Sequence, residues 1–254
     1  MNDLFQIITP SAPIRNCSNT SSSLISEALF GECFKVIERH NACAYGVNLS
    51  DNYVGWVELS KMGKIIKPTH IVHVPRTLIY SEPSVHSNII QYLPFSSLIR
   101  IVNENNNWSE IKINDILGYI SKNHYVDKNL QESDWVKYAE LLLNTPYHFG
   151  GRDSIGLDCS ALLQLSIKFA GVSLERDTKD QVNSKLLKNS DGFKIKRGSI
   201  IFWKNHVAIG INNYEIIHAN AYHMTTNIEP FEEANRRIQK TNGKITCIKE
   251  IINE

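Results

Sequence analysis

The amino-acid sequence predicts an α+β domain at its C-terminal end, preceded by two small β-barrels. Short runs of β-branched and aromatic residues, separated by Asn, Asp and Gly, fill residues 24–126, as is typical of small antiparallel β-domains. Beyond Asp127, two helix-like segments near 135–143 and 159–170 precede a series of apolar strands. Helices followed by antiparallel strands indicate an α+β arrangement for this second half of the chain.

The front half contains two similar sets of strands. The segments DNYVGWVEL (51–59) and NDILGYISK (114–122) each place an acidic or amide turn before an apolar–Gly–aromatic–apolar strand. Their spacing, about 63 residues, indicates an internal duplication of one small unit. Five or six short strands in such a unit predict an SH3-like barrel. We therefore predict an extended lead-in over 1–23 and SH3-like domains over 24–66 and 67–128; one larger β-sandwich is the alternative.

Size and charge limit the classes of partner. A chain of 254 residues suits two or three small domains. Its charged (21%) and apolar (42%) fractions are ordinary for a globular protein. The formal net charge of +1 leaves no electrostatic signature of nucleic-acid binding or of a polybasic membrane surface. We therefore expect small molecules or peptides as partners, with no nucleic acid and no membrane.

The cysteines and the N-terminal residues bear on the compartment. Five Cys, an odd number without a C-x-x-C pair, indicate free thiols in a reducing compartment. The first residues have neither a basic segment nor an apolar run typical of a signal peptide. No segment approaches the roughly 18 apolar residues that span a bilayer. We expect a cytoplasmic protein, or an exported one if a signal peptide has been removed.

Cys159 stands at the start of a predicted amphipathic helix. The triplet Asp158-Cys159-Ser160 opens directly into an apolar run with helical spacing, and Gly171 is a natural end for it. Unpaired N–H groups at a helix start favour thiolate over thiol, so this position predicts a nucleophilic Cys. The alternative is that Cys159 is a small buried residue that only fills space. The residues that surround Cys159 must decide between a nucleophilic and a structural role.

Two histidines offer the base and the orienting group that a thiol nucleophile needs. His206 opens an apolar strand and His218 ends the next one. A two-residue loop at 212–213 would place the two imidazoles on opposite faces, whereas a three-residue loop would set them directly opposite each other. A functional pair therefore requires an odd-length hairpin or a bulge. Zinc bound by both His and Cys159 is the alternative; because no acidic partner is evident, we predict no metal and no cofactor.

At the level of motifs, the second half resembles the NlpC-type cysteine peptidases, papain-like bacterial hydrolases of peptidoglycan stem peptides. The matching motifs, in order, are YHFGG, GLDCSALLQ, LERDTKDQ, RGSIIFW, HVAIGI and IIHA. The front half resembles the two bacterial SH3-like domains of the branch that cleaves γ-D-glutamyl bonds next to a free N-terminal L-Ala. The resemblance implies a papain-like peptidase domain over 129–254.

The same resemblance implies a role for each matching residue. Cys159 would be the nucleophile, His206 the general base and acid, and His218 the orienting residue. Tyr147 would help to position the substrate carbonyl or its oxyanion, together with the backbone N–H of Cys159. The implied substrate contacts are Asp158, Ser160, Asp177 and Thr178, with Tyr53 and Glu32 from the first SH3-like domain. Among these, a carboxylate such as Asp177 suits a free α-ammonium.

Two residues depart from the family pattern: Ala161 stands where Gly usually follows the D-C-S triplet, and Phe149 replaces the usual Trp before the Gly pair. Ala favours a helix, and Phe149 affects pocket shape more than chemistry. The resemblance implies a monomeric peptidase that hydrolyses the γ-D-glutamyl–diamino acid bond of murein tripeptides or tetrapeptides through a thioester, in cytoplasmic recycling. The alternatives are a non-catalytic wall-peptide-binding protein, which an intact Cys, His and His disfavours, and a papain-like acyltransferase, which would need a lipid-facing surface.

Overall fold

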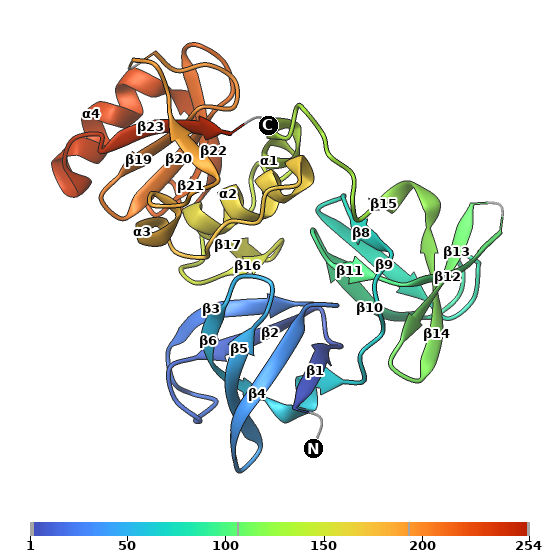
Figure 1. Ribbon diagram of the computed structural model, residues 1–254. Helices are drawn as coiled ribbons and strands as arrows, with labels where there is room; N and C mark the ends of the chain where they lie inside the picture. Colours follow the sequence, from blue (N-terminus) through green and yellow to red (C-terminus); the bar gives the residue numbers. More distant parts are fainter. Residues whose placement is uncertain (1–2, 106, 193, 253–254) are drawn as a thin grey trace. The chain divides into compact units, whose positions relative to one another are not determined.

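The computed structural model describes residues 3–105, 107–192 and 194–252, and divides into two compact units (Figure 1). Unit 1 comprises 1–130 with 152–154, and unit 2 comprises 131–151 with 155–254. The sequence places this division after residue 128. It does not anticipate that 152–154 is grouped with unit 1.

Unit 1 consists of short strands and two single 3₁₀ turns. In chain order its elements are β1 (Leu4–Ile7), β2 (Ser11–Arg15), β3 (Leu24–Leu29), β4 (Cys33–His40), β5 (Cys43–Asn48), β6 (Tyr53–Glu58), η1 (Leu59–Lys61), β7 (Met62–Gly63), β8 (His70–Val72), β9 (Arg76–Tyr80), β10 (Ile89–Pro94), β11 (Leu98–Ile99), β12 (Ile101–Asn105), β13 (Trp108–Ile113), β14 (Ile116–Ser121), η2 (Lys122–His124), β15 (Tyr125–Asp127) and β16 (Arg152–Asp153).

The strands of unit 1 form two sets with the same topology. The first set is one sheet of order β3-β2-β6-β5-β4-β1-β7. The second set forms two sheets, of order β10-β9-β14-β13-β12 and β11-β8-β15. If β11 and β12 together correspond to β4, these two sheets joined end to end repeat the strand order of the first set. Strands β6 and β14 begin at residues 53 and 116, 63 residues apart, as the duplication predicts. The sequence motif that recurs at 51–59 and 114–122 therefore reflects a strand topology that occurs twice in unit 1.

A glycine occupies the same place in both sets because two strands approach closely there. A Cβ atom on Gly55 would lie 2.5 Å from Cγ2 of Ile14, and one on Gly118 would lie 2.5 Å from Cγ2 of Ile79. At separations below 3 Å, the isoleucine side chain or its strand would have to shift. The Gly before the aromatic residue in each motif is thus a packing requirement of the shared topology.

The predicted lead-in over 1–23 is wrong. Strand β1 pairs with β4 and β7, and β2 pairs with β3, so both belong to the first sheet. Pro13 lacks an N–H group and therefore suggests a loop. The structure accommodates it within β2 because β2 pairs with its second neighbour, β6, only at Arg15. Ala12 and Ile14 are wholly buried and alternate with partly buried neighbours, which anchors this strand in the core.

Each strand set has its own hydrophobic core. One cluster gathers residues of the first set around Phe34, and another gathers residues of the second set around Ile79 and Ile111. Phe30 is the exception, because it lies in the chain of the first set but packs into the core of the second. The two sets are therefore distinct packing units within unit 1.

Residues 152–154 are held by both strand sets. The guanidinium of Arg152 is buried and donates to the two carboxylate oxygens of Glu32 at 2.9 and 3.0 Å. Burial opposes the charge of Arg152, but Glu32 and Asp51 raise its pKa above the ordinary value. From the second set, the hydroxyl of Tyr92 donates to Asp153 at 2.8 Å. A short segment from beyond residue 130 thus completes the polar interior of unit 1.

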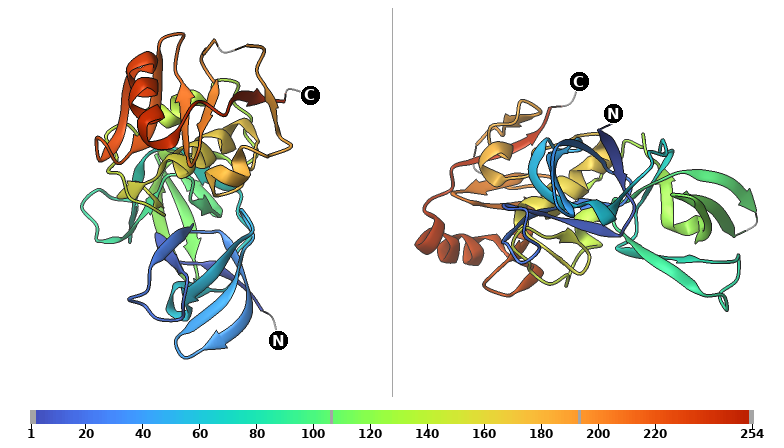
Figure 2. Two further views of the ribbon diagram at one scale, coloured as in Figure 1. Left: turned by 90° about the vertical axis from the view of Figure 1, so that its left-hand side faces the viewer. Right: turned by 90° about the horizontal axis from the view of Figure 1, so that it is seen from below.

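Unit 2 combines helices with one antiparallel sheet. Its elements are α1 (Val136–Glu140), β17 (Gly156–Leu157), α2 (Cys159–Ile167), η3 (Lys168–Ala170), α3 (Thr178–Gln181), β18 (Leu187–Asn189), β19 (Ile200–Trp203), β20 (His206–Gly210), β21 (Glu215–Asn220), β22 (Thr225–Pro230), α4 (Phe231–Asn242) and β23 (Cys247–Ile251). The sheet order is β18-β23-β19-β20-β21-β22, and the sheet is flanked by α2 on one face and α4 on the other (Figure 2).

Helix α2 is the buried centre of unit 2. It contacts α1, α3, β20 and β21, and all nine of its residues are buried. The predicted amphipathic character is wrong because no side of the helix faces solvent. The predicted ends are confirmed: α2 begins at Cys159, and Gly171 closes the following 3₁₀ turn with φ of 79°. Helix α1 is shorter than predicted, and the turn after it ends at Asn144, which has φ of 66°.

Among the helices that the structure describes, none combines the length and the apolar character needed to cross a membrane.

Candidate active site

Four of the residues singled out from the sequence line one cavity of unit 2, with a volume of about 400 Å³. They are Tyr147, Cys159, His206 and His218. The rest of the wall comes from the turn before β20, the end of β21 and the helix α4, and includes Asn205, Asn220, Tyr222, Arg237, Thr241 and Asn242. A thiol and two imidazoles thus meet in a partly enclosed cavity.

The start of α2 is fixed by a buried ion pair. Asp158 is the N-cap residue, and its two carboxylate oxygens accept from the backbone N–H groups of Ala161 and Gly150, each at 2.9 Å. Arg176 donates to the same two oxygens at 2.9 and 2.7 Å. Burial raises the pKa of Asp158, but the Arg176 charge and these hydrogen bonds hold it below the ordinary value. Asp158 is therefore a permanent anion directly before the thiol.

Burial also decides the state of the Cys159 thiol. Desolvation, followed by the Asp158 carboxylate, raises its pKa to about 11, against hydrogen bonds from Val207 and Thr178. The Thr178 hydroxyl lies 4.0 Å from Sγ. The predicted thiolate is thus wrong for the protein at rest, because the helix start favours the anion less than burial disfavours it.

The two histidines are hydrogen-bonded to each other. Nε2 of His206 lies 2.8 Å from Nδ1 of His218. Burial lowers the pKa of His206 to about 3 and lowers that of His218, so both imidazoles are neutral at pH 7. Because Nε2 of His206 is engaged, Nδ1 is the nitrogen left to accept a proton from the thiol.

The hairpin between β20 and β21 has the odd-length connection that the sequence requires. Gly210 pairs with Ile216, so residues 211–215 form the connection. Continuing this register sets His206 opposite Asn220 and places His218 diagonally across on the same face. A loop of odd length is confirmed, whereas direct opposition of the two histidines is wrong.

Tyr147 is half-buried in the same cavity. Burial, to which the Asp158 carboxylate adds, raises the pKa of Tyr147 to about 12. Its hydroxyl therefore keeps its proton and can donate a hydrogen bond to a developing negative charge. The backbone N–H of Cys159, at the start of α2, is a further donor for such a charge.

The other residues predicted to bind substrate lie either in unit 2, as Ser160 and Asp177 do, or in unit 1, as Tyr53 and Glu32 do. Ser160 is buried beside Asp158, to which it donates at 3.0 Å, and accepts from Arg176 at 2.7 Å. Asp177 occupies the N-cap position of α3, and a third of its side chain is exposed. Tyr53 and Glu32 lie in unit 1. Tyr53 is half-buried and Glu32 is fully buried against Arg152; substrate contact by either stays a prediction.

Sequence reasoning missed two charged residues behind the histidines, Glu229 and Arg237. Nε2 of His218 lies 2.6 Å from Oε1 of Glu229, and the guanidinium of Arg237 donates to both oxygens of the same carboxylate. Desolvation alone would raise the pKa of Glu229, but the bonds from His218 and Arg237 lower it well below the ordinary range. In the sequence, Glu229 is one of several acidic residues around Pro230, and no local signal separates it from the exposed ones.

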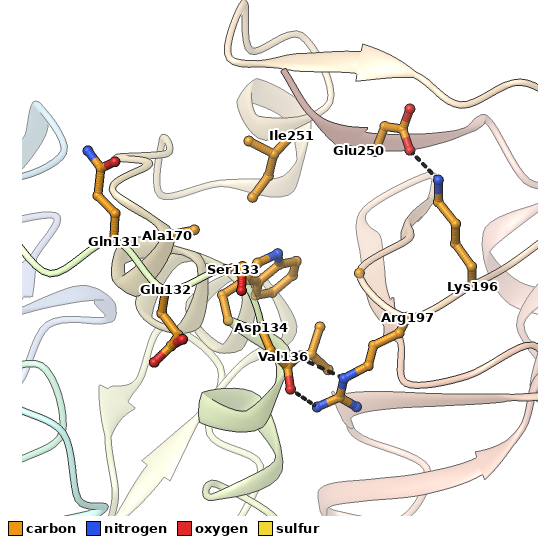
Figure 3. A pocket seen from close by; sticks show the side chains of 12 residues that line it. Gln131, Glu132, Ser133, Asp134, Val136, Ala170, Lys196, Arg197, Glu250 and Ile251 are labelled. Carbon is orange, nitrogen blue, oxygen red and sulfur yellow. Dashed lines mark hydrogen bonds and ion pairs between the residues drawn. The ribbon is translucent and has the colours of Figure 1, made fainter. Parts of the chain in front are cut away.

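A larger hollow of about 770 Å³ lies elsewhere in unit 2, between the start of α1, the turn before β19 and strand β23 (Figure 3). Its charged side chains are paired within the chain: Arg197 with Asp134 at 2.7 Å, and Lys196 with Glu250 at 2.8 Å. Neither Cys159 nor the two histidines are among the described residues that line it. The smaller cavity therefore remains the candidate active site.

Comparison with known proteins finds two family models that match this chain. Residues 144–241 match a family model described as the NlpC/P60 family, and residues 14–62 match one described as the bacterial dipeptidyl-peptidase Sh3 domain. Dipeptidyl-peptidase 6 of Lysinibacillus sphaericus is 22% identical over 233 residues, which are 84% of this chain and 86% of that protein. The gamma-D-glutamyl-L-lysine dipeptidyl-peptidase of Bacillus subtilis strain 168 is 24% identical over 188 residues, 66% of this chain and 60% of that protein.

A solved structure shares the whole fold. The crystal structure of an NlpC/P60 family protein from Bacillus cereus ATCC 10987 covers 98% of this chain and 100% of its own, with a TM-score of 0.82. At 15% sequence identity, this likeness shows the fold alone.

Proposed function

We propose that this chain, which carries an NlpC/P60 domain behind a bacterial SH3 domain, is a cysteine peptidase of murein peptides. It hydrolyses the bond between γ-D-glutamate and the following diamino acid in tripeptides or tetrapeptides that have a free N-terminal L-Ala. One observation carries the proposal. Cys159, at the start of α2, shares a cavity with His206, and Nε2 of His206 is hydrogen-bonded to Nδ1 of His218. The names of the relatives from Bacillus support the substrate class.

The reaction begins from a neutral thiol and a neutral imidazole. As Sγ of Cys159 attacks the γ-carbonyl carbon, the thiol proton passes to Nδ1 of His206. The carbonyl oxygen becomes an oxyanion, for which the Cys159 backbone N–H and the Tyr147 hydroxyl are donors. His206 then protonates the departing amine, which leaves a thioester. Water, deprotonated by His206, attacks the thioester and releases the γ-glutamyl product.

We also assign an SH3-like barrel to the second strand set of unit 1, because its strand order repeats that of the first set. In unit 2, a thiol at the start of a buried central helix shares a cavity with an imidazole on an antiparallel sheet. This is the arrangement expected of a papain-like peptidase, and it supports that assignment for the NlpC/P60 domain.

Asp177 is our candidate for the carboxylate that binds the substrate's free amine. It is partly exposed at the start of α3, next to Thr178, whose hydroxyl approaches Sγ of Cys159. An ammonium group bound by a carboxylate gains a charge-assisted hydrogen bond. Asp158 and Ser160 support this region through Arg176. Glu32 is not carried into the proposal, because an ammonium would have to displace the guanidinium of Arg152 from it.

The nucleophile is tested by Cys159→Ala in a mass-spectrometric digest of L-Ala-γ-D-Glu-diamino acid tripeptides. We expect release of the diamino acid to fall by a factor on the order of 10⁴ or more, because no thioester can form. Cys247→Ala, which changes a half-buried thiol of the same unit outside the cavity, is the matched control. Turnover that persists in Cys159→Ala would contradict the assignment.

Amine recognition is tested by comparing free and N-acetylated tripeptides. Acetylation should remove most turnover by the wild type. In Asp177→Asn the preference for the free amine should shrink by roughly tenfold to hundredfold, since a charge-assisted bond is worth about 1.5–3 kcal/mol. Asp180→Asn, on the exposed side of the same short helix, should leave the preference unchanged. Equal cleavage of both peptides by the wild type would refute recognition of the amine.

A further inference from the structure

Three side chains on neighbouring strands of unit 2 form a continuous line of hydrogen bonds that starts at the proposed base. Nε2 of His206 on β20 lies 2.8 Å from Nδ1 of His218 on β21, and Nε2 of His218 lies 2.6 Å from Oε1 of Glu229 on β22. His218 is wholly buried and Glu229 is nearly so. Because the strand registers place all three on the face that α4 covers, the line is built into the sheet.

The charge at the far end of this line decides where each proton lies. An ionised carboxylate only accepts hydrogen bonds, so Nε2 of His218 must carry the proton that it donates to Glu229. In a neutral imidazole the other nitrogen is then an acceptor, so Nδ1 of His218 receives a hydrogen bond from Nε2–H of His206. Neutral His206, with its proton on Nε2, has a lone pair on Nδ1. That is the form that can take the proton of Cys159.

Arg237 on α4 keeps Glu229 in the form that this argument requires. Its two terminal nitrogens donate to the two carboxylate oxygens, with Nη1 at 2.8 Å from Oε2. The ring of His223 lies 3.7 Å from the same Oε2, and Tyr222 stacks over the guanidinium at 4.3 Å. The charged or titratable groups around His218 therefore include His206, Glu229, Arg237 and His223. Of these, Arg237 donates hydrogen bonds to Glu229, as His218 itself does.

We propose that Glu229 is a positioning residue of the peptidase, which fixes His218 as the Nε2–H tautomer and so presents unprotonated Nδ1 of His206 to the thiol. The proposal rests on the proposed function for its catalytic consequence, but its tautomer statement concerns the free protein. When His206 takes the thiol proton, its Nε2–H remains bonded to His218. The positive charge then lies two hydrogen bonds from the carboxylate, which stabilises it without itself being protonated.

The tautomers can be read directly from long-range ¹H–¹⁵N correlation spectra of the full-length protein without substrate. The wild type should show both His206 and His218 protonated at Nε2 alone near pH 7. In Glu229→Gln, an amide can donate as well as accept, so protonation at Nδ1 should become populated in both rings. Glu233→Gln, an exposed acid in the first turn of α4, is the matched control and should leave the spectra unchanged. Nδ1–H tautomers in the wild type would overturn the proposal.

Kinetics separate positioning from a merely structural ion pair. Glu229→Gln should lower kcat by roughly tenfold to hundredfold with little change in KM. Glu229 acts on the base His206 only through His218, so it orients the base and does not bind substrate. Glu229→Asp, which keeps the charge, should recover part of the loss. The carboxylate raises the pKa of His206, so its removal should also move the acid limb of the kcat profile to lower pH. A loss of stability alone would not move that limb.

The outcomes remain separable from failure of the proposed function. If the wild type cleaves no murein peptide but the tautomers change in Glu229→Gln, the substrate assignment fails and the positioning role stands. If the wild type is active and Glu229→Gln keeps its kcat, its acid limb and its tautomers, Glu229 is a structural partner of Arg237 and the positioning role is refuted.

Discussion

Two carboxylate–guanidinium pairs flank the proposed reacting atoms, and they differ in what else the carboxylate binds. On the nucleophile side, Asp158 accepts from Arg176 and from two backbone N–H groups. On the base side, Glu229 accepts from Arg237 and from the ring of His218. The first guanidinium is 1% exposed and the second 25%.

The difference separates two tasks. Asp158 bonds backbone, so its pair holds the path of the chain around the Gly pair and the start of α2. Glu229 bonds an imidazole, so its pair holds the position of a proton. A buried pair that loses one partner leaves an uncompensated charge, whereas a partly exposed pair is relieved by water. The nucleophile side should therefore control stability, and the base side should control the rate of the chemical step.

The largest expected effect concerns the thiol between the two pairs. With a pKa of about 11, only on the order of 10⁻⁴ of Cys159 is thiolate at pH 7. Alkylation of Cys159 by iodoacetamide should accelerate by roughly tenfold for each pH unit between 7 and 10. The rate is followed by mass spectrometry of the Cys159 peptide, with a short Cys peptide as reference. A rate that levels off below pH 8.5 would show that the helix start outweighs burial.

Arg176→Met should give the largest loss of stability. It leaves the buried Asp158 carboxylate without its charge partner, which costs about 3–5 kcal/mol. Hydrogen exchange of the α2 amides in the full chain measures this loss where it is expected. Arg197→Met breaks two partly exposed pairs in the same unit, with Asp134 and Glu140, and should cost about 0–1 kcal/mol for each pair. Equal losses in the two variants would remove the contrast between buried and exposed pairs.

Arg237→Met should have a smaller effect, and one of a different kind. Glu229 remains and still accepts from His218, so kcat should fall by less than in Glu229→Gln, by about tenfold or below. The Arg237 charge lowers the pKa of both His206 and His218. Its removal raises them, so the acid limb of the kcat profile should move to higher pH, opposite to Glu229→Gln. A shift in the same direction for both variants would contradict the arrangement.

The nucleophile side was predictable because its information is local. Asp158, Cys159 and Ser160 are consecutive, and a polar triplet before an apolar run gives both the helix start and its cap. Parity of the strands also predicted that His206 and His218 need an odd-length hairpin. The amphipathic character of α2 was not predictable, since its apolar stripe does not reveal that the remaining sides are covered as well.

The sequence by itself determined the repeat of unit 1, the helix that begins at Cys159 and the strands that carry the two histidines. These follow from periodicity and turn chemistry, which act over a few residues. The tertiary structure alone decided that Glu229 and Arg237 stand behind His218, that 152–154 belongs with unit 1 and that the thiol is neutral. Each depends on burial and on contacts between residues distant in the chain, because desolvation and pairing of charges arise only when the elements pack.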